Sequence, residues 1–252
     1  MKIGITEWND AGIDFRWEDK LENLNGVILI TKSVNNVFRK KVLAHMDKLP
    51  IIVHCTCTGW GASPLESNVP SLKKQLDWLK ELIDSGFPAK QVVLRIDPIF
   101  PSEKGLKRVA EVLDYAKEIN LPMEDIRCRI SIVDEYPHVR KRFESLGWTP
   151  LYGGNFYASW AQMEAVGELL QQYPYKFATC AEDKLVNKFP STFEIKGCIS
   201  RDDLEIMNVE YDEKLFENPQ KRSGCHCLSC KTELLKPREK CSHGCVYCYW
   251  KD

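Results

Sequence analysis

The C-terminal end of the chain carries three cysteines at a spacing that suits a metal cluster. They are Cys241, Cys245 and Cys248, in the order Cys-x3-Cys-x2-Cys. Three thiolates on one tight loop can bind three irons of a 4Fe–4S cube and leave the fourth iron open to another ligand. Gly244 permits the turn that so short a loop requires. The spacing therefore predicts an iron–sulfur cluster with one open coordination position.

Zinc is the alternative occupant of this segment. Cysteine and histidine are the usual ligands of tetrahedral zinc, and one or two such sites could be built from Cys225, His226, Cys227, Cys230, Cys241, His243, Cys245 and Cys248. Zinc ribbons usually pair two Cys-x2-Cys knuckles, whereas the spacers here differ from one another. The spacing favours iron–sulfur chemistry, and zinc stays open as the other interpretation.

Polar side chains at the ends of apolar runs indicate a second part of the same site. The runs are predicted strands at 2–8, 26–32, 50–56, 91–97, 127–133 and 175–181. Helical patterns lie between them. The clearest starts at Ser71, a second runs over 104–119, and a third contains Met163, Val166 and Leu170. Such alternation predicts a parallel sheet covered by helices, with the active site at the carboxyl ends of the strands.

The number of strands limits the architecture. Six units are too few for a complete eight-stranded barrel, so we expect an α/β fold with a partial (β/α)6 TIM-type barrel or an open sheet. The alternation of predicted strands and helices stops near residue 183, apart from a possible helix over 201–207. We therefore expect a barrel over 1–182 and a cysteine-rich cluster-binding segment over 183–252. That segment has too little apolar content for a core of its own, so a metal or docking onto the barrel must organise it.

At these residues the chain resembles a known superfamily. Cys-x3-Cys-x2-Cys with Tyr247 before the last cysteine resembles the radical S-adenosylmethionine (SAM) enzymes, and CSHGCVYCYW is similar to the subgroup around spore photoproduct lyase. ITKS (Ile30–Ser33), LESNVPS (Leu65–Ser71) and LRIDPIFP (Leu94–Pro101) resemble successive barrel elements of that subgroup. With TCTGWG, SIVDEY, TCAE and GCIS, they resemble an uncharacterised bacterial and phage family with a C-terminal cluster motif, over about residues 25–250.

The resemblance implies a function for each matching residue. Cys241, Cys245 and Cys248 would hold the cluster, and the amino and carboxylate groups of SAM would chelate its open iron. Tyr247 would lie beside the adenine, and Lys32, Ser33 and Glu7 would contact SAM. Glu66 would bind ribose or pair with Arg95, which ends a strand together with Asp97. An external electron donor such as a flavodoxin or ferredoxin would reduce the cluster.

One feature departs from the superfamily pattern, in which the cluster motif follows the first strand near the N-terminus. If residues 175–181 are the equivalent of that strand, the order is a circular permutation of the usual barrel. Chain ends that lie close together make such a permutation physically inexpensive.

The remaining cysteines suggest two further roles. Cys180, Cys198, Cys225 and Cys227 fall in elements shared with the uncharacterised family, and four thiolates suit a second 4Fe–4S cluster or a zinc ion. Cys55 and Cys57 stand at the end of a strand and could return a hydrogen atom to a substrate radical in a lyase, whereas a mutase (isomerase) would need no such thiol. Cys128 is expected to be a small buried side chain inside a strand.

The substrate is the least determined part of the prediction. By analogy with the subgroup and with phage DNA modification, we expect a nucleobase or nucleotide, such as an amino-acid-modified thymidine in DNA. Lys and Arg outnumber acids after Pro219, and Tyr247, Tyr249 and Trp250 could stack on bases, although a solvated basic tail is the plain alternative. A peptide or small-metabolite substrate, or a zinc module without catalysis, also remains open.

Composition excludes several classes of protein. With 44% hydrophobic and 28% charged residues and a net charge of −1, the 252-residue chain is neither disordered nor fitted for long contacts with duplex DNA. The N-terminus lacks the features of a signal peptide, and no apolar run approaches the roughly 18 residues that span a bilayer. We therefore expect a cytoplasmic protein with no membrane partner, in which clustered cysteines bind metal.

Overall fold

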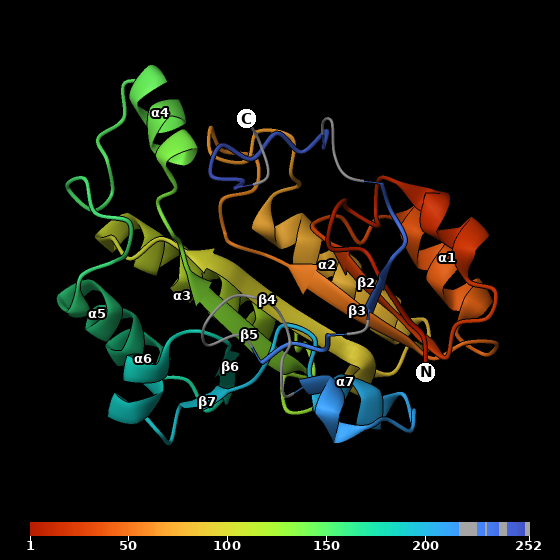
Figure 1. The fold of residues 1–252 in the computed structure, drawn as a ribbon. Helices are drawn as coiled ribbons and strands as arrows, with labels where there is room; N and C mark the ends of the chain where they lie inside the picture. The colour runs from red at the N-terminus through yellow and green to blue at the C-terminus, as the bar shows by residue number, and fades with distance from the viewer. Residues whose placement is uncertain (217–225, 230, 237–240, 250–252) are drawn as a thin grey trace.

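The computed structural model describes residues 1–216, 226–229, 231–236 and 241–249. Its centre is one parallel sheet of eight strands (Figure 1) in the order β7-β6-β5-β4-β3-β2-β1-β8. The strands are β1 (Ile3–Ile5), β2 (Gly26–Thr31), β3 (Ile51–Thr56), β4 (Val92–Ile99), β5 (Arg127–Ile132), β6 (Phe177–Thr179), β7 (Phe193–Ile195) and β8 (Lys231–Glu233). From β1 to β7 the order in space follows the order in the chain, as in a partial βα barrel.

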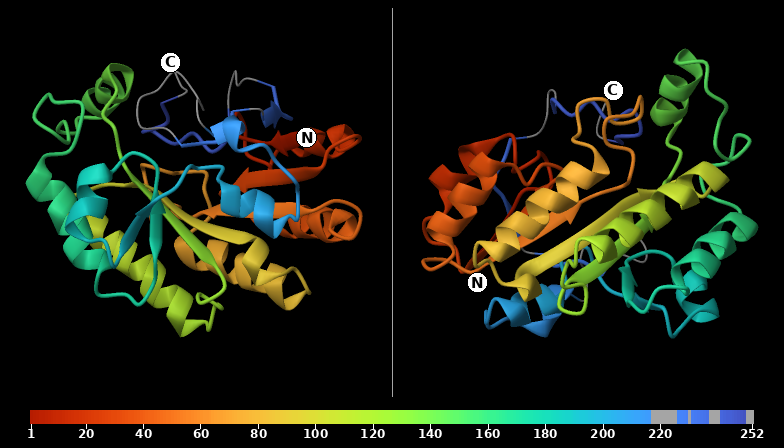
Figure 2. Two further views of the ribbon diagram at one scale, coloured as in Figure 1. Left: turned by 60° about the horizontal axis from the view of Figure 1, so that its bottom comes forward. Right: turned by 180° about the vertical axis from the view of Figure 1, so that it is seen from behind.

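Helices cover one face of the sheet, seen from behind in Figure 2. They are α1 (Asn36–His45), α2 (Leu72–Asp84), α3 (Glu103–Glu118) and α5 (Trp160–Leu170), while the shorter α4 (Pro137–Ser145) and α6 (Asp183–Lys188) follow β5 and β6. Alternate strand residues such as Val53 and Leu94 pack with Leu76 and Leu79 of α2 in the main hydrophobic core. Ser71 stands at the start of α2 as predicted, although its side chain makes no capping hydrogen bond.

The opposite face of the sheet has its own, smaller core. Ile5, Ile28 and Ile52 pack there against Leu204 and Met207 at helix α7 (Arg201–Ile206). Asp203 of α7 is fully buried and pairs with Arg127 at 2.6 Å and with Arg129 at 3.0 Å. These two ion pairs hold α7 against β5 with a polar contact beside the apolar one.

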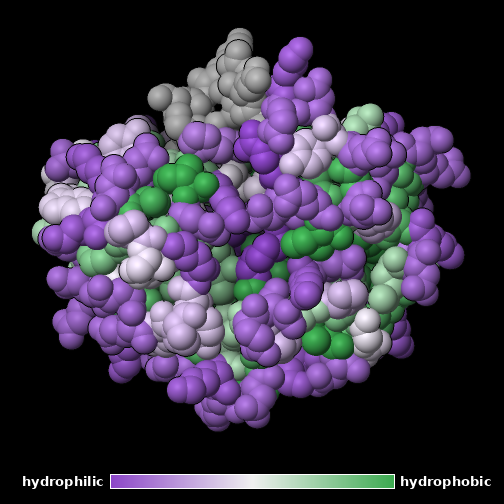
Figure 3. Space-filling model, turned by 90° about the horizontal axis from the view of Figure 1, so that it is seen from below, coloured by the Kyte–Doolittle hydropathy of each residue, from purple (hydrophilic) through white to green (hydrophobic). Residues whose placement is uncertain are grey.

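The face seen from below in Figure 3 is mainly hydrophilic, and its hydrophobic residues form small separate patches. No helix among the described residues is long and apolar enough to cross a membrane.

All six predicted strands are present, and so are the helices expected from Ser71, over 104–119, around Val166 and over 201–207. The strand count was wrong: β7 and β8 were missed because each is short and, unlike the equally short β1 and β6, mostly only half-buried. Both come from beyond residue 182, so that segment adds strands to the same sheet. β8 pairs in parallel with β1, whereas β6, expected to precede β1 in the barrel order, pairs with β5 and β7.

Candidate functional site

The cysteine motif forms a compact loop beyond β8. Gly244 has a φ of +64°, in the left-handed region that glycine favours. The Gly244 N–H donates to the Cys241 carbonyl at 3.3 Å, and the Cys248 N–H donates to the Cys245 carbonyl at 3.2 Å. Two successive tight turns thus bring the motif into the compact form that its spacing predicted.

The segment between β3 and α2 supports this loop from one side. The Val246 N–H donates to the Leu65 carbonyl at 3.0 Å, and the Asn68 side-chain amide donates to the Ser242 carbonyl at 2.9 Å. On the other side, Arg142 of α4 donates to the Cys248 carbonyl at 2.6 Å. The loop is therefore held at the carboxyl ends of the strands, where polar residues were expected to gather.

A buried histidine inside the motif joins it to the loop after β1. His243 Nε2 lies 2.9 Å from the Asp10 carboxylate, while His243 Nδ1 lies 3.2 Å from the Asn68 carbonyl. Asp10 also accepts hydrogen bonds from the Thr31 hydroxyl and the Lys32 N–H, both at 2.6 Å. Burial would raise the pKa of Asp10, but His243 and these donors hold it below its ordinary value.

Lys32, Glu66 and Tyr247 form one contiguous cluster beside the motif. Lys32 Nζ lies 2.9 Å from Glu66 Oε1 and 2.9 Å from the Tyr247 hydroxyl, which also donates to Glu66. Glu66 is fully buried, and its Oε2 atom has no hydrogen-bond partner among the described residues. Burial alone would lower the pKa of Lys32, but the attraction of Glu66 raises it above its ordinary value.

The thiols of the motif are close to one another and to this cluster. Burial raises the pKa of Cys245 to about 12; Lys32 opposes the rise, and Glu66, Cys248 and Cys241 add to it. As the side chains stand, no three His, Cys, Asp or Glu groups of the described residues surround a common point at ligating distance. Cys241 and Cys248 nevertheless both act on Cys245, and three thiols are the donors that a 4Fe–4S cluster takes.

Arg95 and Asp97 pair with each other, not with Glu66. They follow one another on one face of β4, and Asp97 also accepts a hydrogen bond from Ser131 on β5. Burial would lower the pKa of Arg95, but Asp97 and the neighbouring Cys198 raise it. Of the two roles expected for Glu66, pairing with Arg95 is therefore wrong, and Lys32 is its partner.

Three of the four cysteines assigned to a second metal site meet near Arg95. The sulfurs of Cys180 and Cys198 are 3.6 Å apart, and Cys227 Sγ accepts the Cys198 N–H at 3.1 Å. The contacts of Cys180 and Cys227, with Arg95 and Arg129 nearby, hold the pKa of Cys198 well below its ordinary value. Cys225, the fourth, lies outside the described residues.

Glu7 lies where β1 meets β8. Its carboxylate accepts two hydrogen bonds from Lys231 at 2.7 Å, while the Glu233 carboxylate accepts the Glu7 and Trp8 N–H groups at 2.9 and 3.1 Å. These contacts tie β8, which leads into the motif, to the end of β1.

The other predicted residues are buried, and the charge of Lys32 acts on two of them, Cys55 and Cys57. Cys55 and Cys57 belong to the main core between the sheet and its helices, and burial raises the pKa of both thiols, that of Cys57 to about 12. Ser33 is buried and accepts a hydrogen bond from Asn35 at 3.2 Å. Cys128 is buried in β5, as expected for a small apolar side chain.

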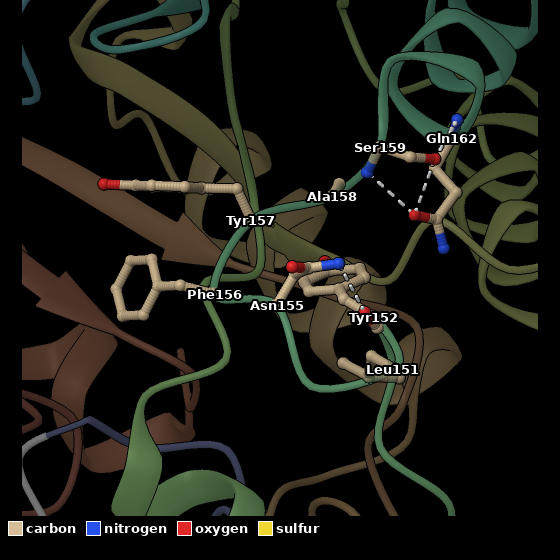
Figure 4. Close-up of a pocket in the computed structure, with 8 residues that line it drawn as sticks. All are labelled: Leu151, Tyr152, Asn155, Phe156, Tyr157, Ala158, Ser159 and Gln162. Carbon is tan, nitrogen blue, oxygen red and sulfur yellow. Dashed lines mark hydrogen bonds between the residues drawn. The ribbon is translucent and has the colours of Figure 1, made fainter.

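A pocket of about 480 Å³ lies outside this site, between the loop after α4 and the start of α5 (Figure 4). Tyr152, Phe156 and Tyr157 bring aromatic rings to it, and Asn155 and Gln162 bring amides. A second pocket of about 240 Å³ lies near the start of β5. None of the predicted site residues lines either pocket.

An aromatic row connects the first pocket to the motif. The ring of Tyr136 stacks on that of Tyr249 at 5.8 Å between centroids and meets that of Phe156 at 4.7 Å. Tyr249 is 53% exposed and follows Cys248 directly, and its carbonyl lies 2.9 Å from His138 Nε2. The row therefore leads from the end of the cysteine motif to the pocket.

Asp10 and Asn68 were missed by sequence reasoning, and His243 was considered only as a zinc ligand. Asp10 lies in a loop, where a lone acidic residue gives no periodic signal. Asn68 stands inside LESNVPS, whose likeness to a known element drew attention to Glu66 alone. Only the position of His243 between two motif cysteines marked it as part of the site.

Fold and site together define a barrel-like α/β protein with a cysteine loop at the carboxyl ends of its parallel strands. Residues 15–250 match the model of a family described as a domain of unknown function (DUF1848), which stands in the radical SAM-like superfamily. Because the match covers nearly the whole chain, the protein belongs to this family. No curated protein matches the chain.

Proposed function

We propose that the protein is a radical SAM enzyme whose 4Fe–4S cluster is held by Cys241, Cys245 and Cys248. One observation carries the proposal: the motif loop docks at the carboxyl ends of the strands through Asp10–His243 and beside the Lys32–Glu66–Tyr247 cluster. When bound, the reduced cluster and SAM would supply a 5′-deoxyadenosyl radical. The protein's own residues bind SAM, orient it and exclude water.

The orphaned oxygen of Glu66 supports the assignment of a SAM-binding residue. A buried acceptor without a donor costs about 1–3 kcal/mol, so such atoms usually face a ligand or water. A ribose hydroxyl or the ammonium group of SAM would satisfy Glu66 Oε2. Lys32 and Tyr247 fix the other oxygen of the same carboxylate, so Glu66 is held in place for this contact.

The position of β8 favours a circularly permuted barrel with a different first strand from the one expected. β8 pairs with β1 and is the strand that precedes the cluster motif. Taking β8 as the equivalent of the usual first strand puts β1 second and β2 third, with the motif in its usual place after the first strand. This assignment replaces the one that began with residues 175–181.

We infer a nucleobase or nucleotide as the substrate class. Tyr249 presents an exposed ring directly after the last motif cysteine, and aromatic rings stack on bases with little regard to sequence. The adjoining pocket adds amides that can pair with the edge of a base. Tyr247 is buried against Phe100, so its ring does not offer a free face on which a base could stack.

Anaerobic reconstitution tests the chemistry against its main alternative. A radical SAM enzyme is brown, binds iron and sulfide through the motif, and cleaves SAM to 5′-deoxyadenosine when reduced. A colourless protein with stoichiometric zinc that does not change on reconstitution would show a zinc module without this activity. Adding DNA, nucleosides or peptides then identifies the substrate class as the one that accelerates 5′-deoxyadenosine release.

The same assay separates the two reaction types. If a thiol returns the hydrogen atom, Cys55→Ala or Cys57→Ala should abolish product formation while SAM cleavage continues. The burial of both thiols in the helix-facing core disfavours that role, so we expect full turnover in both variants, as for a mutase.

A further inference from the structure

We propose that Cys180, Cys198 and Cys227 bind a tetrahedral zinc ion that fastens the chain ahead of β8 to the ends of β6 and β7. Cys180 directly follows β6, Cys198 follows β7, and Cys227 stands before β8. Cysteines from three separate segments meet only where the fold brings them together. The site is separate from the cluster motif and does not depend on the proposed radical chemistry.

The separation of two sulfurs favours a single ion over a second cluster. Zinc binds thiolates at about 2.3 Å in a tetrahedron, which places two sulfurs about 3.8 Å apart. Cys180 Sγ and Cys198 Sγ are 3.6 Å apart, and neither is in a disulfide. In a cubane each cysteine binds a different corner iron, which sets the sulfurs considerably farther apart.

The surroundings of the sulfurs suit a thiolate site. Three thiolates around one divalent ion leave a net negative charge, and the cationic side chains of Arg95 and Arg129 act on Cys198 from nearby. Arg129 Nη1 and Arg95 Nε are buried with no hydrogen-bond partner among the described residues. The Cys198 N–H donates to Cys227 Sγ, a contact that stabilises a metal-bound sulfur.

The backbone already joins the segments that carry the ligands. The Leu228 N–H donates to the Ile199 carbonyl at 3.0 Å. A Cβ at Gly197 would lie 2.4 Å from the His226 carbonyl oxygen, so only glycine allows this close approach. Among the described residues no three ligating groups surround one point as the side chains stand, so zinc binding requires these side chains to rotate. The described residues supply three of the four ligands that tetrahedral zinc takes.

A zinc ion here would fix the point from which the chain enters β8 and then the motif loop. The tail has few apolar residues to hold it, so a metal would supply stability that its own packing does not. The ion would thus be structural, and its loss would loosen the motif without removing any of the motif's ligands.

Metal analysis of motif-free protein tests the site. The variant Cys241→Ala/Cys245→Ala/Cys248→Ala should keep stoichiometric zinc after anaerobic purification. Adding Cys198→Ala should abolish that zinc, whereas adding Cys128→Ala, a matched loss of a buried thiol, should not. Conversely, Cys198→Ala alone should keep reconstituted iron at the motif, which separates this result from a failure of the proposed function.

Cobalt substitution keeps the test decisive if the Cys198 variant does not fold. In the motif-free protein, Co²⁺ should give the intense sulfur-to-cobalt absorption of a tetrahedral thiolate site. Iron and sulfide in place of zinc, absence of any bound metal, or a Cys180–Cys198 disulfide found by mass spectrometry would each overturn the proposal.

Discussion

At the scale of single residues, Lys32 and Glu66 are charged side chains buried where little water can solvate them. The Lys32 side chain is only 15% exposed, and Glu66 beside it is fully buried. Breaking a buried ion pair leaves one charge without compensation, which costs far more than the loss of a surface pair. A buried ion pair of this kind holds its carboxylate in one position, which suits the ligand contact proposed for Glu66.

We predict that Glu66→Gln destabilises the protein by about 3 kcal/mol, because Lys32 loses its buried counter-charge. Urea denaturation of the protein without cofactors measures the change. The matched control is Asp84→Asn, which breaks the exposed Lys80–Asp84 pair and should cost within about 0.5 kcal/mol. Equal effects of the two substitutions would contradict the buried pair.

Residue types and spacing predicted several members of the site but not the contacts between them. Cys241, Cys245 and Cys248 were found because their spacing is local and their chemistry is specific. Lys32 and Glu66 were found separately, but their pairing depends on how the segment after β3 folds over β2, which no local pattern encodes. Asp10 and His243 are more than two hundred residues apart in the chain and meet only in the fold.

At the scale of elements, long apolar strands were predicted and short polar ones were not. β2 and β3 are nearly all buried, and their apolar runs predicted them directly. β8 has the sequence Lys-Thr-Glu and is only half-buried. β8 forms because β1 offers a parallel edge and because the Glu233 carboxylate accepts a hydrogen bond from the Glu7 N–H. Its existence is therefore a tertiary effect.

The support of the motif by the segment between β3 and α2 leads to a second prediction. Asn68→Ala removes the hydrogen bond to the Ser242 carbonyl, so reconstituted iron should be lost to a chelator several-fold faster. Asn155→Ala, which removes a comparable bond in the loop after α4, should leave the rate unchanged. A rate for Asn68→Ala equal to that of the unaltered protein would show that this segment does not hold the motif.

The contact between β3 and α7 gives a pH-dependent prediction. Burial lowers the pKa of His54 to about 3, although nearby Asp203 opposes the shift. Between about pH 6.5 and pH 3 the unfolded chain therefore binds a proton that the folded chain does not. The contribution of His54 to stability is complete above pH 6.5 and falls by about 1.4 kcal/mol for each pH unit below it.

Urea denaturation at pH 7 and pH 5 measures this effect. Over that range the unaltered protein should lose about 2 kcal/mol more stability than His54→Gln, in which the titrating group is gone. Gln75→Met, which replaces a buried side chain that does not titrate, is the control and should show the pH dependence of the unaltered protein. The same pH dependence in His54→Gln would contradict a buried neutral His54.

At the scale of the whole molecule, both ends of the described chain contribute to one site. β8 and the motif come from the C-terminus and pack against β1 and the loop that follows it, at the edge of a sheet otherwise laid down in chain order. The site is complete only when the last part of the chain has docked. This explains why a segment with few apolar residues of its own can be ordered.

Reductive cleavage of SAM by the reconstituted protein shows whether the C-terminal motif carries radical SAM chemistry. We expect 5′-deoxyadenosine from the unaltered protein and from Cys128→Ala, and none from Cys241→Ala/Cys245→Ala/Cys248→Ala. If the iron-loaded, unaltered protein produces no 5′-deoxyadenosine, or the triple variant produces as much, the motif does not carry this chemistry.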